Sequence, residues 1–262
     1  MKRTSERGCG FTLIELLLAM AVFLVICGAM FSLLQLSQQR YSSETQLSGS
    51  FQEARLAMDQ IARDVNDAGF PSAGMFSKLP ASTSYTVSPI AWWPSYPTVA
   101  CAIESTCSPT PGDFDLIIET TIGTTVSWIR YQLIGTTLYR GSIAKNGTDP
   151  IGATSTAGVM VPFLVNVMNN AMNTSPTQFA QITAAYPSMF PTGNPVPIFQ
   201  YSCDTPGGGV VACPTAGFYN SPANVRDVDI TLIVMTQQPD SQTQQIKLIE
   251  LNGRGHRLNP AN

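Results

Sequence analysis

The sequence predicts an α+β protein in which one long N-terminal helix packs on an antiparallel β-sheet. A long apolar run near the N-terminus continues into a stripe of apolar residues at helical spacing. Segments with the alternating pattern of β-strands follow in the second half of the chain, after a region rich in Pro, Ser, Thr and Gly. This separation of a helical part from a strand-rich part is typical of the α+β class.

Length and composition set limits on the architecture and on the partners. With 262 residues, the chain can form one sizeable head domain with an anchor, or two small domains. The net charge is −3, so no basic surface indicates binding to nucleic acid. The part beyond the apolar run is rich in Thr, Ser, Asn, Gln, Gly and Pro, a profile typical of an exported β-rich domain.

A short polar leader precedes the apolar run. The leader, residues 1–10, contains the basic residues Lys2, Arg3 and Arg7. Phe11–Leu36 follows, and its clearly polar side chains are those of Thr12, Glu15, Ser32 and Gln35. A helix of about 20 residues can cross a bilayer. The basic leader predicts that the start of the chain stays in the cytoplasm and that the remainder is exported.

Three kinds of N-terminal signal fit this pattern: a secretory signal peptide cut near Cys27–Ala29, an uncleaved anchor, and a prepilin signal cut before the apolar run. Glu15 distinguishes them, because a carboxylate in a spanning helix costs on the order of 3 kcal/mol. Cleavage after Gly10 would place a new α-amino group on Phe11, four residues before Glu15. The amine and the carboxylate can then pair, and the helix dipole favours a carboxylate there. We therefore favour the prepilin signal.

The segment Gly10–Glu15, with the sequence GFTLIE, resembles the prepilin peptidase motif of type IV pilins and of type II secretion pseudopilins. The resemblance implies that prepilin peptidase cuts after Gly10 and methylates the amine of Phe11, and that Glu15 guides subunit docking. It implies a single-pass protein of the bacterial inner membrane with its head in the periplasm, and then a place in a pilus fibre at the cell surface. The implied partners are prepilin peptidase, other minor and major pilins, the inner-membrane assembly platform and membrane lipid.

The helix is predicted to continue past the membrane. Apolar residues recur there at steps of four and three, which places them on one helix face: Leu47, Phe51, Ala54, Met58, Ile61, Val65 and Ala68. Gly69 and Pro71 predict the end of the helix. The expected organisation is a leader at 1–10, a transmembrane half at 11–36, an amphipathic half at 37–69 and a β-rich head at 70–262.

Short β-strand patterns follow in the head: Phe114–Thr120, Thr125–Ile134, Leu138–Arg140, Val159–Met168, Ile198–Ser202, Val228–Val234 and Gln244–Leu251. The last two are expected to form an antiparallel hairpin. The segments Pro71–Gly112 and Asn169–Pro197 show no persistent period, so we expect them to be irregular.

Two segments of the head extend the resemblance at the level of pattern. Arg55–Phe70 and Trp128–Gly141 resemble segments of PilW-type minor pilins, and the J-type pseudopilin of type II secretion has a similar plan. The resemblance implies a minor pilin that takes part in pilus assembly or initiation, at or near the filament tip. A pseudopilin is the near alternative. A membrane-anchored exported binding module or enzyme is the alternative from another class.

Cysteine spacing predicts two local disulfides, Cys101–Cys107 and Cys203–Cys213. Export to an oxidising compartment favours disulfides, and the spacings fit a zinc site poorly. Each bond would close a short loop with little regular structure of its own. Cys27 is interpreted as an apolar residue of the helix.

The remaining candidates for chemistry have simpler interpretations. Asp113 with Asp115, and Asp227 with Asp229, could bind calcium but are better explained as solvated strand ends. His256, the one histidine, is expected in a solvated tail. Trp92 and Trp93 fit a loop packed on the core better than a surface for a partner. We expect no catalytic residues, no metal and no cofactor.

Overall fold

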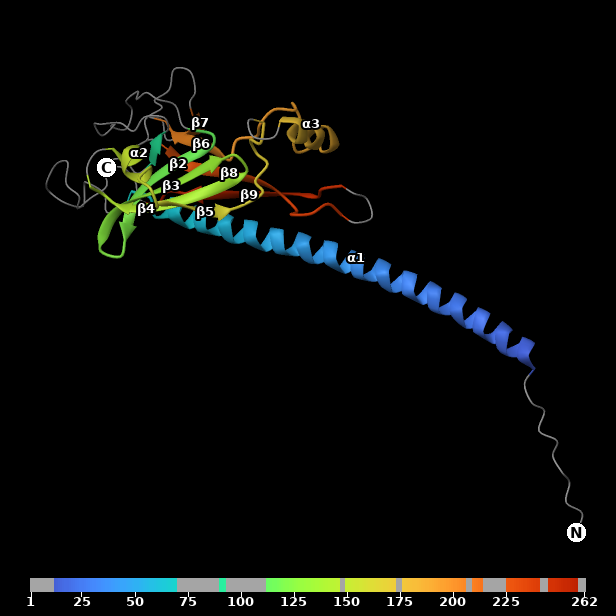
Figure 1. The fold of residues 1–262 in the computed structure, drawn as a ribbon. Coiled ribbons are helices and arrows are strands. Elements are labelled where there is room, and N and C mark those ends of the chain that lie inside the picture. The colour runs from blue at the N-terminus through green and yellow to red at the C-terminus, as the bar shows by residue number, and fades with distance from the viewer. Residues whose placement is uncertain are drawn as a thin grey trace, which may run out of the picture.

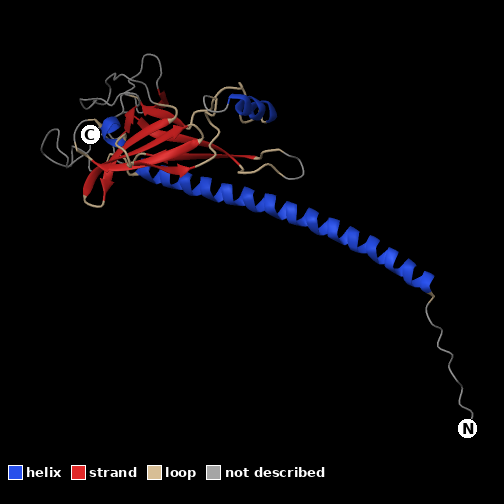
Figure 2. Ribbon diagram, viewed as in Figure 1, coloured by secondary structure: helices blue, strands red, loops and turns tan. Residues whose placement is uncertain are grey.

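One long helix and a head of two antiparallel sheets make up the computed structural model (Figures 1 and 2). The structure describes residues 12–69, 90–92, 112–146, 149–172, 176–205, 209–213, 225–240 and 245–258. The helix, α1 (Leu13–Asn66), has 54 residues and extends far beyond the head in Figure 1. This arrangement confirms the predicted α+β class.

The first half of α1 carries its apolar side chains on the outside. The large apolar residues between Leu13 and Leu36 are exposed, because the head does not reach this part of the helix. By length and composition this part can cross a membrane, and none of its most apolar stretch is buried in the protein. An apolar surface of this size on an isolated helix requires lipid or other helices around it.

The second half of α1 packs against the head along the predicted stripe. Its buried apolar residues are Ala54, Ala57, Met58, Ile61 and Val65, and Ala68 is buried just beyond the helix. The stripe was predicted too far toward the N-terminus: Phe51 is 41% exposed and Leu47 only partly buried. The main core of the head therefore covers α1 only from about Ser50 onward, although the apolar period starts earlier.

The first sheet is a five-stranded antiparallel meander in the order β1-β2-β3-β4-β5. Its strands are β1 (Ile90–Trp92), β2 (Asp115–Ile122), β3 (Thr125–Ile134), β4 (Thr137–Ala144) and β5 (Met160–Leu164). Tight turns join β2 to β3 and β3 to β4. Gly123 and Gly135 occupy these turns with φ of 65°, a conformation that glycine adopts without strain.

The second sheet has four strands in the order β7-β6-β8-β9. They are β6 (Phe199–Asp204), β7 (Val210–Cys213), β8 (Val225–Met235) and β9 (Leu248–His256). β8 and β9 form the predicted final hairpin. An isolated bridge between Val167 and Val234 connects the chain after β5 to β8.

Several elements lie where the sequence predicted none or predicted other bounds. β1 and the helix α3 (Pro176–Ala185) lie in the two segments expected to be irregular, whereas the helix α2 (Pro150–Thr154) and the short strand β7 lie where no element was predicted. α3 buries Phe179 and Ile182 in a second apolar cluster with Phe190 and Ile233. β9 continues to His256, so this residue belongs to a strand and not to a tail.

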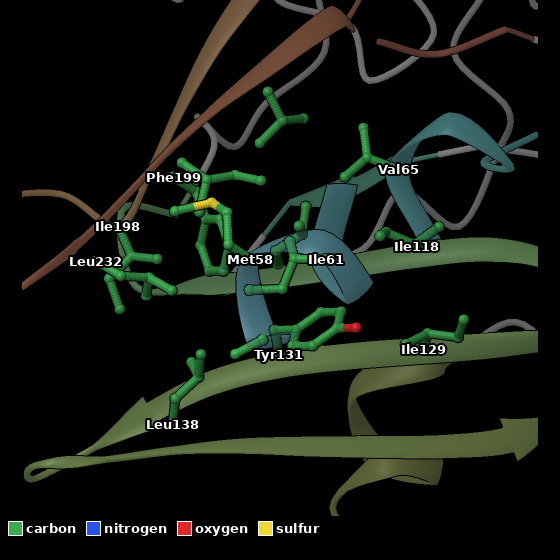
Figure 3. Close-up of a cluster of buried hydrophobic side chains, with 14 of the residues drawn as sticks. Met58, Ile61, Val65, Ile118, Ile129, Tyr131, Leu138, Ile198, Phe199 and Leu232 are labelled. Atoms are coloured by element: carbon green, nitrogen blue, oxygen red, sulfur yellow. The ribbon is translucent and has the colours of Figure 1, made fainter. Parts of the chain in front are cut away.

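The main core lies where α1 meets both sheets (Figure 3). Met58, Ile61 and Val65 of α1 are buried among residues of both sheets. The first sheet contributes Ile118, Ile129, Tyr131 and Leu138, and the second contributes Phe199 and Leu232 with the preceding Ile198. One helix face thus holds the two sheets in a single core.

Two glycines of β9 allow α1 to approach the strand backbone. A Cβ atom added at Gly253 would lie 2.5 Å from Sδ of Met58, and one at Gly255 would lie 2.5 Å from Cβ of Val65. Cβ atoms do not come this close to other heavy atoms, so any larger residue would push the helix away. Glycine is needed here for close approach and not for a special backbone angle.

We therefore expect Gly255→Ala to destabilise the head by about 1–3 kcal/mol through overpacking against Val65. Urea unfolding of the full chain in detergent, followed by Trp fluorescence, measures the loss. Gly49→Ala is the matched control, because no atom lies within 4 Å of its added Cβ and alanine favours a helix. Equal stability of the Gly255 and Gly49 variants would contradict the close packing.

Candidate functional site

The N-terminal end of α1 contains a capping box formed by Thr12 and Glu15. The Glu15 carboxylate accepts hydrogen bonds from the backbone N–H and the hydroxyl of Thr12, both at 3.0 Å from Oε2. The backbone N–H of Glu15 donates to Oγ1 of Thr12 at 3.3 Å. A capping box satisfies N–H groups that a helix start leaves without partners. Gly10 and Phe11, the predicted cleavage and methylation residues, lie outside the described residues.

This arrangement holds the Glu15 carboxylate beside Thr12, the second residue after the predicted cleavage position. Its sequence neighbours on α1 are apolar, and Glu15 is the one charged residue between Phe11 and Leu36. Ser32 satisfies its hydroxyl inside the helix by donating to the carbonyl of Gly28 at 3.0 Å. The carboxylate can accept further hydrogen bonds, so an amine on residue 11 or on a neighbouring chain would be a suitable donor.

A second polar site attaches α1 to the head. Asp64 of α1 accepts a hydrogen bond from the Tyr131 hydroxyl at 2.5 Å and pairs with Arg140 at 2.9 Å. Gln60 donates to the other carboxylate oxygen at 2.8 Å. Burial, and then the nearby Asp64 charge, raise the pKa of Tyr131 well above its ordinary value, so the phenol stays protonated as a donor. We call Asp64, Tyr131 and Arg140 the helix–head junction.

Sequence reasoning missed the helix–head junction, although a signal was present. Asp64 lies between Ile61 and Val65, beside the apolar stripe, where an acid is unexpected. A buried acid needs partners. Alternation along Thr125–Ile134 puts Tyr131 on one strand face with Ile129, and that face is the one that meets α1.

Two further ion pairs are buried in the first sheet. Arg130 binds Asp115 through two nitrogens, at 2.6 and 3.0 Å, and also donates to hydroxyls near α2. Lys145 pairs with Glu119 at 2.5 Å. Desolvation raises the pKa of Asp115 even though Arg130 opposes the shift. Asp115 is therefore a buried structural residue, and its interpretation as a solvated strand end was wrong.

The predicted acidic pair on β8 is used for contacts across the hairpin. Asp229 pairs with Arg254 at 2.5 Å, and Asp227 lies 2.6 Å from Nδ1 of His256. Within the described parts of the chain, no group of three or more His, Cys, Asp or Glu residues is arranged to hold a metal ion. Asp113 lies at the surface just before β2, and partial desolvation of its carboxyl group by the neighbouring chain raises its pKa.

The predicted disulfide Cys203–Cys213 is present and joins β6 to the short strand β7, with the two Cα atoms 5.6 Å apart. Closure of so short a loop contributes roughly 2–3 kcal/mol in the loop-entropy picture. Cys101 and Cys107 lie outside the described residues, as do Trp93 and the side chain of Trp92. Cys27 is a free, exposed cysteine of α1.

Comparison with known proteins identifies the N-terminus. Residues 7–31 match the family model described as the prokaryotic N-terminal methylation motif. The match covers the end of the leader, the predicted Gly10–Phe11 junction, Glu15 and the first turns of the apolar helix. It supports the type IV pilin and pseudopilin class. No curated protein and no solved structure matches the chain.

For the helix–head junction, we expect Asp64→Asn to destabilise the head by about 1–3 kcal/mol, because the buried partners lose a charged acceptor. Thermal unfolding of the full chain measures the effect. Asp59→Asn, an exposed change on the opposite side of α1, should leave stability within about 0.5 kcal/mol. Similar losses in both variants would show that the junction does not stabilise the attachment of α1.

Proposed function

We propose that the chain is the precursor of a minor type IV pilin that takes part in pilus assembly or initiation, at or near the filament tip. The observation that carries the proposal is the methylation motif at residues 7–31, placed directly before an exposed apolar helix that is attached to a folded head. A chain of this form can be processed at its N-terminus, held by one helix in the inner membrane, and passed into a filament with its head intact.

In the proposed mechanism, prepilin peptidase cuts between Gly10 and Phe11 and methylates the new amine. The head lies in the periplasm, on the side opposite the basic leader. The carboxylate of Glu15 then forms an ion pair with the N-terminal amine of a neighbouring pilin. This pairing aligns the apolar helices in register. The helix–head junction keeps the head packed against the second half of α1 while the first half leaves the membrane.

The size of the head supports a minor subunit. About 190 residues follow Gly69, and α3 with its own apolar cluster extends the head beyond the main core. Such a head repeated along a shaft would crowd its neighbours, whereas a tip has no subunits above it. The PilW-like patterns at Arg55–Phe70 and Trp128–Gly141 support the same assignment.

Two alternative functions remain to be tested against this proposal: a pseudopilin of type II secretion, and an anchored exported binding module or enzyme. Deletion of the gene with imaging of surface filaments separates assembly proteins from anchored modules. Quantitative mass spectrometry of sheared filaments tests the minor role. If this chain were the most abundant subunit, the minor assignment would be wrong while the pilin class would stand.

We expect the mature protein to begin at Phe11 with a methylated amine, because the polar leader meets the apolar helix there. Intact mass and N-terminal peptide analysis of protein extracted from membranes measure this directly. Gly10→Val should leave the leader attached, since a bulky side chain replaces the glycine before the cut. A mature start at Met30, or an intact Met1, would contradict the prepilin assignment.

We expect Glu15→Ala to leave membrane insertion intact and to reduce incorporation into filaments at least tenfold. The alanine removes the acceptor that a neighbour's amine requires in an apolar surrounding. Immunoblots of sheared filaments and of membranes compare the two pools. Glu44→Ala, on the exposed polar part of α1, is the control and should incorporate normally.

A further inference from the structure

The hairpin of β8 and β9 contacts α1 well before the start of the main core. Ser43 of α1 donates a hydrogen bond to Oδ2 of Asp240 at 2.9 Å. Lys247 pairs with the same oxygen at 2.7 Å and donates to the Ser43 hydroxyl at 3.3 Å. Figure 1 shows this hairpin reaching along α1 toward the N-terminal half of the helix. We call Ser43, Asp240 and Lys247 the hairpin contact.

The position of the hairpin contact along α1 places it next to the membrane. Ser43 lies seven residues after Leu36, which is about 10 Å along the helix axis. The run from Leu13 to Leu36 spans about 36 Å, slightly more than the hydrocarbon core of about 30 Å. Headgroups add roughly 5–8 Å on each side. With Leu36 at the edge of the hydrocarbon core, Ser43 and the hairpin contact lie about 2–5 Å outside the headgroup layer, within the reach of long basic side chains.

Two basic residues lie close to this layer: the exposed Arg40 on α1, and Lys247 on the hairpin beside Ser43. Arg40 precedes Ser43 by three residues, so the two lie on neighbouring positions of one helix side, with Arg40 nearer the membrane. Lys247 is 40% exposed, and Asp240 and Ser43 use only two of its three N–H donors. Glu44 also lies on α1 but one turn farther from the membrane than Arg40.

We propose that Arg40 and Lys247 bind the phosphates of anionic phospholipids and that the β8–β9 hairpin rests on the membrane surface before the subunit is extracted. The inference rests on the proposed anchoring of α1. Tyr41, which is 73% exposed beside Arg40, has the amphipathic ring that favours the same layer. The contact fixes how deeply α1 sits, because the hairpin stops further insertion.

The test uses the processed full chain in vesicles of phosphatidylcholine with a fraction of phosphatidylglycerol. A fluorescent amino acid replaces Gln245, beside the hairpin contact, and a headgroup nitroxide lipid quenches it. The control probe replaces Thr124 in the β2–β3 turn. That turn is distal, because Gly69 and Asp67 at the end of α1 bond to Glu119 and Thr120 of β2. We expect at least threefold stronger quenching at position 245 than at position 124.

A charge variant tests the chemistry of the contact. Arg40→Gln with Lys247→Gln should lower the preference for phosphatidylglycerol over phosphatidylcholine vesicles at least twofold, measured by quenching at position 245. Lys247→Arg should retain the preference, and Arg55→Gln, on an exposed part of α1 far above the membrane, should not change it. A preference unchanged in the double variant would overturn the phosphate assignment.

Flotation of the vesicles separates this inference from the proposed function. Protein that floats but shows equal, weak quenching at positions 245 and 124 would overturn the hairpin contact with lipid while leaving the anchor in place. Cross-linking of position 245 to a second protein head under those conditions would assign the surface to a protein partner instead. Protein that does not float would reject the anchor and the lipid contact together.

Discussion

The fold depends on direct contact between the second half of α1 and the backbone of β9. Gly253 and Gly255 remove the side chains that would otherwise separate helix and strand, so that Met58 and Val65 pack on the sheet itself. Ile61 then reaches the core that both sheets share. Because the first half of α1 makes no such contacts within the described protein, a force applied to the anchor reaches the head through about five helical turns.

Polar residues give this attachment its specificity. The close fit of Met58 and Val65 on the two glycines already limits the register of α1, and the Asp64 carboxylate limits it further because it meets its donors only beside Tyr131 and Arg140. The buried pairs of Arg130 with Asp115 and of Lys145 with Glu119 likewise fix the packing of the first sheet. Removing one member of such a pair leaves a buried charge, which costs more than the pair contributes.

Helices and strands with a regular hydrophobic pattern of their own could be predicted from the sequence. Elements that are stabilised mainly by residues distant in the sequence were missed. The apolar stripe of α1 and the alternating strands of the two hairpins could be predicted, because one face of each is buried continuously. α3 has the short sequence PTQFAQITAA without charged residues, and its burial against Phe190 could not be read locally. The need for glycine at two positions of β9 likewise becomes clear only from the packing of α1 on that strand. The pattern Thr12-x-x-Glu15, by contrast, is a local sequence signal for the capping box.

The capping box also changes how the role of Glu15 is understood. In the uncleaved chain its carboxylate is already engaged, since Thr12 supplies two donors from within the same helix. Cleavage after Gly10 would add a positive amine one residue before Thr12, at the end of α1 where the helix dipole is itself positive. That amine is unfavourable in an apolar surrounding unless a carboxylate lies close to it. Glu15 of the same chain would therefore be shared between its cap and the new amine. A second Glu15 from a neighbouring chain would relieve this competition, so the proposed processing would itself favour association of the helices.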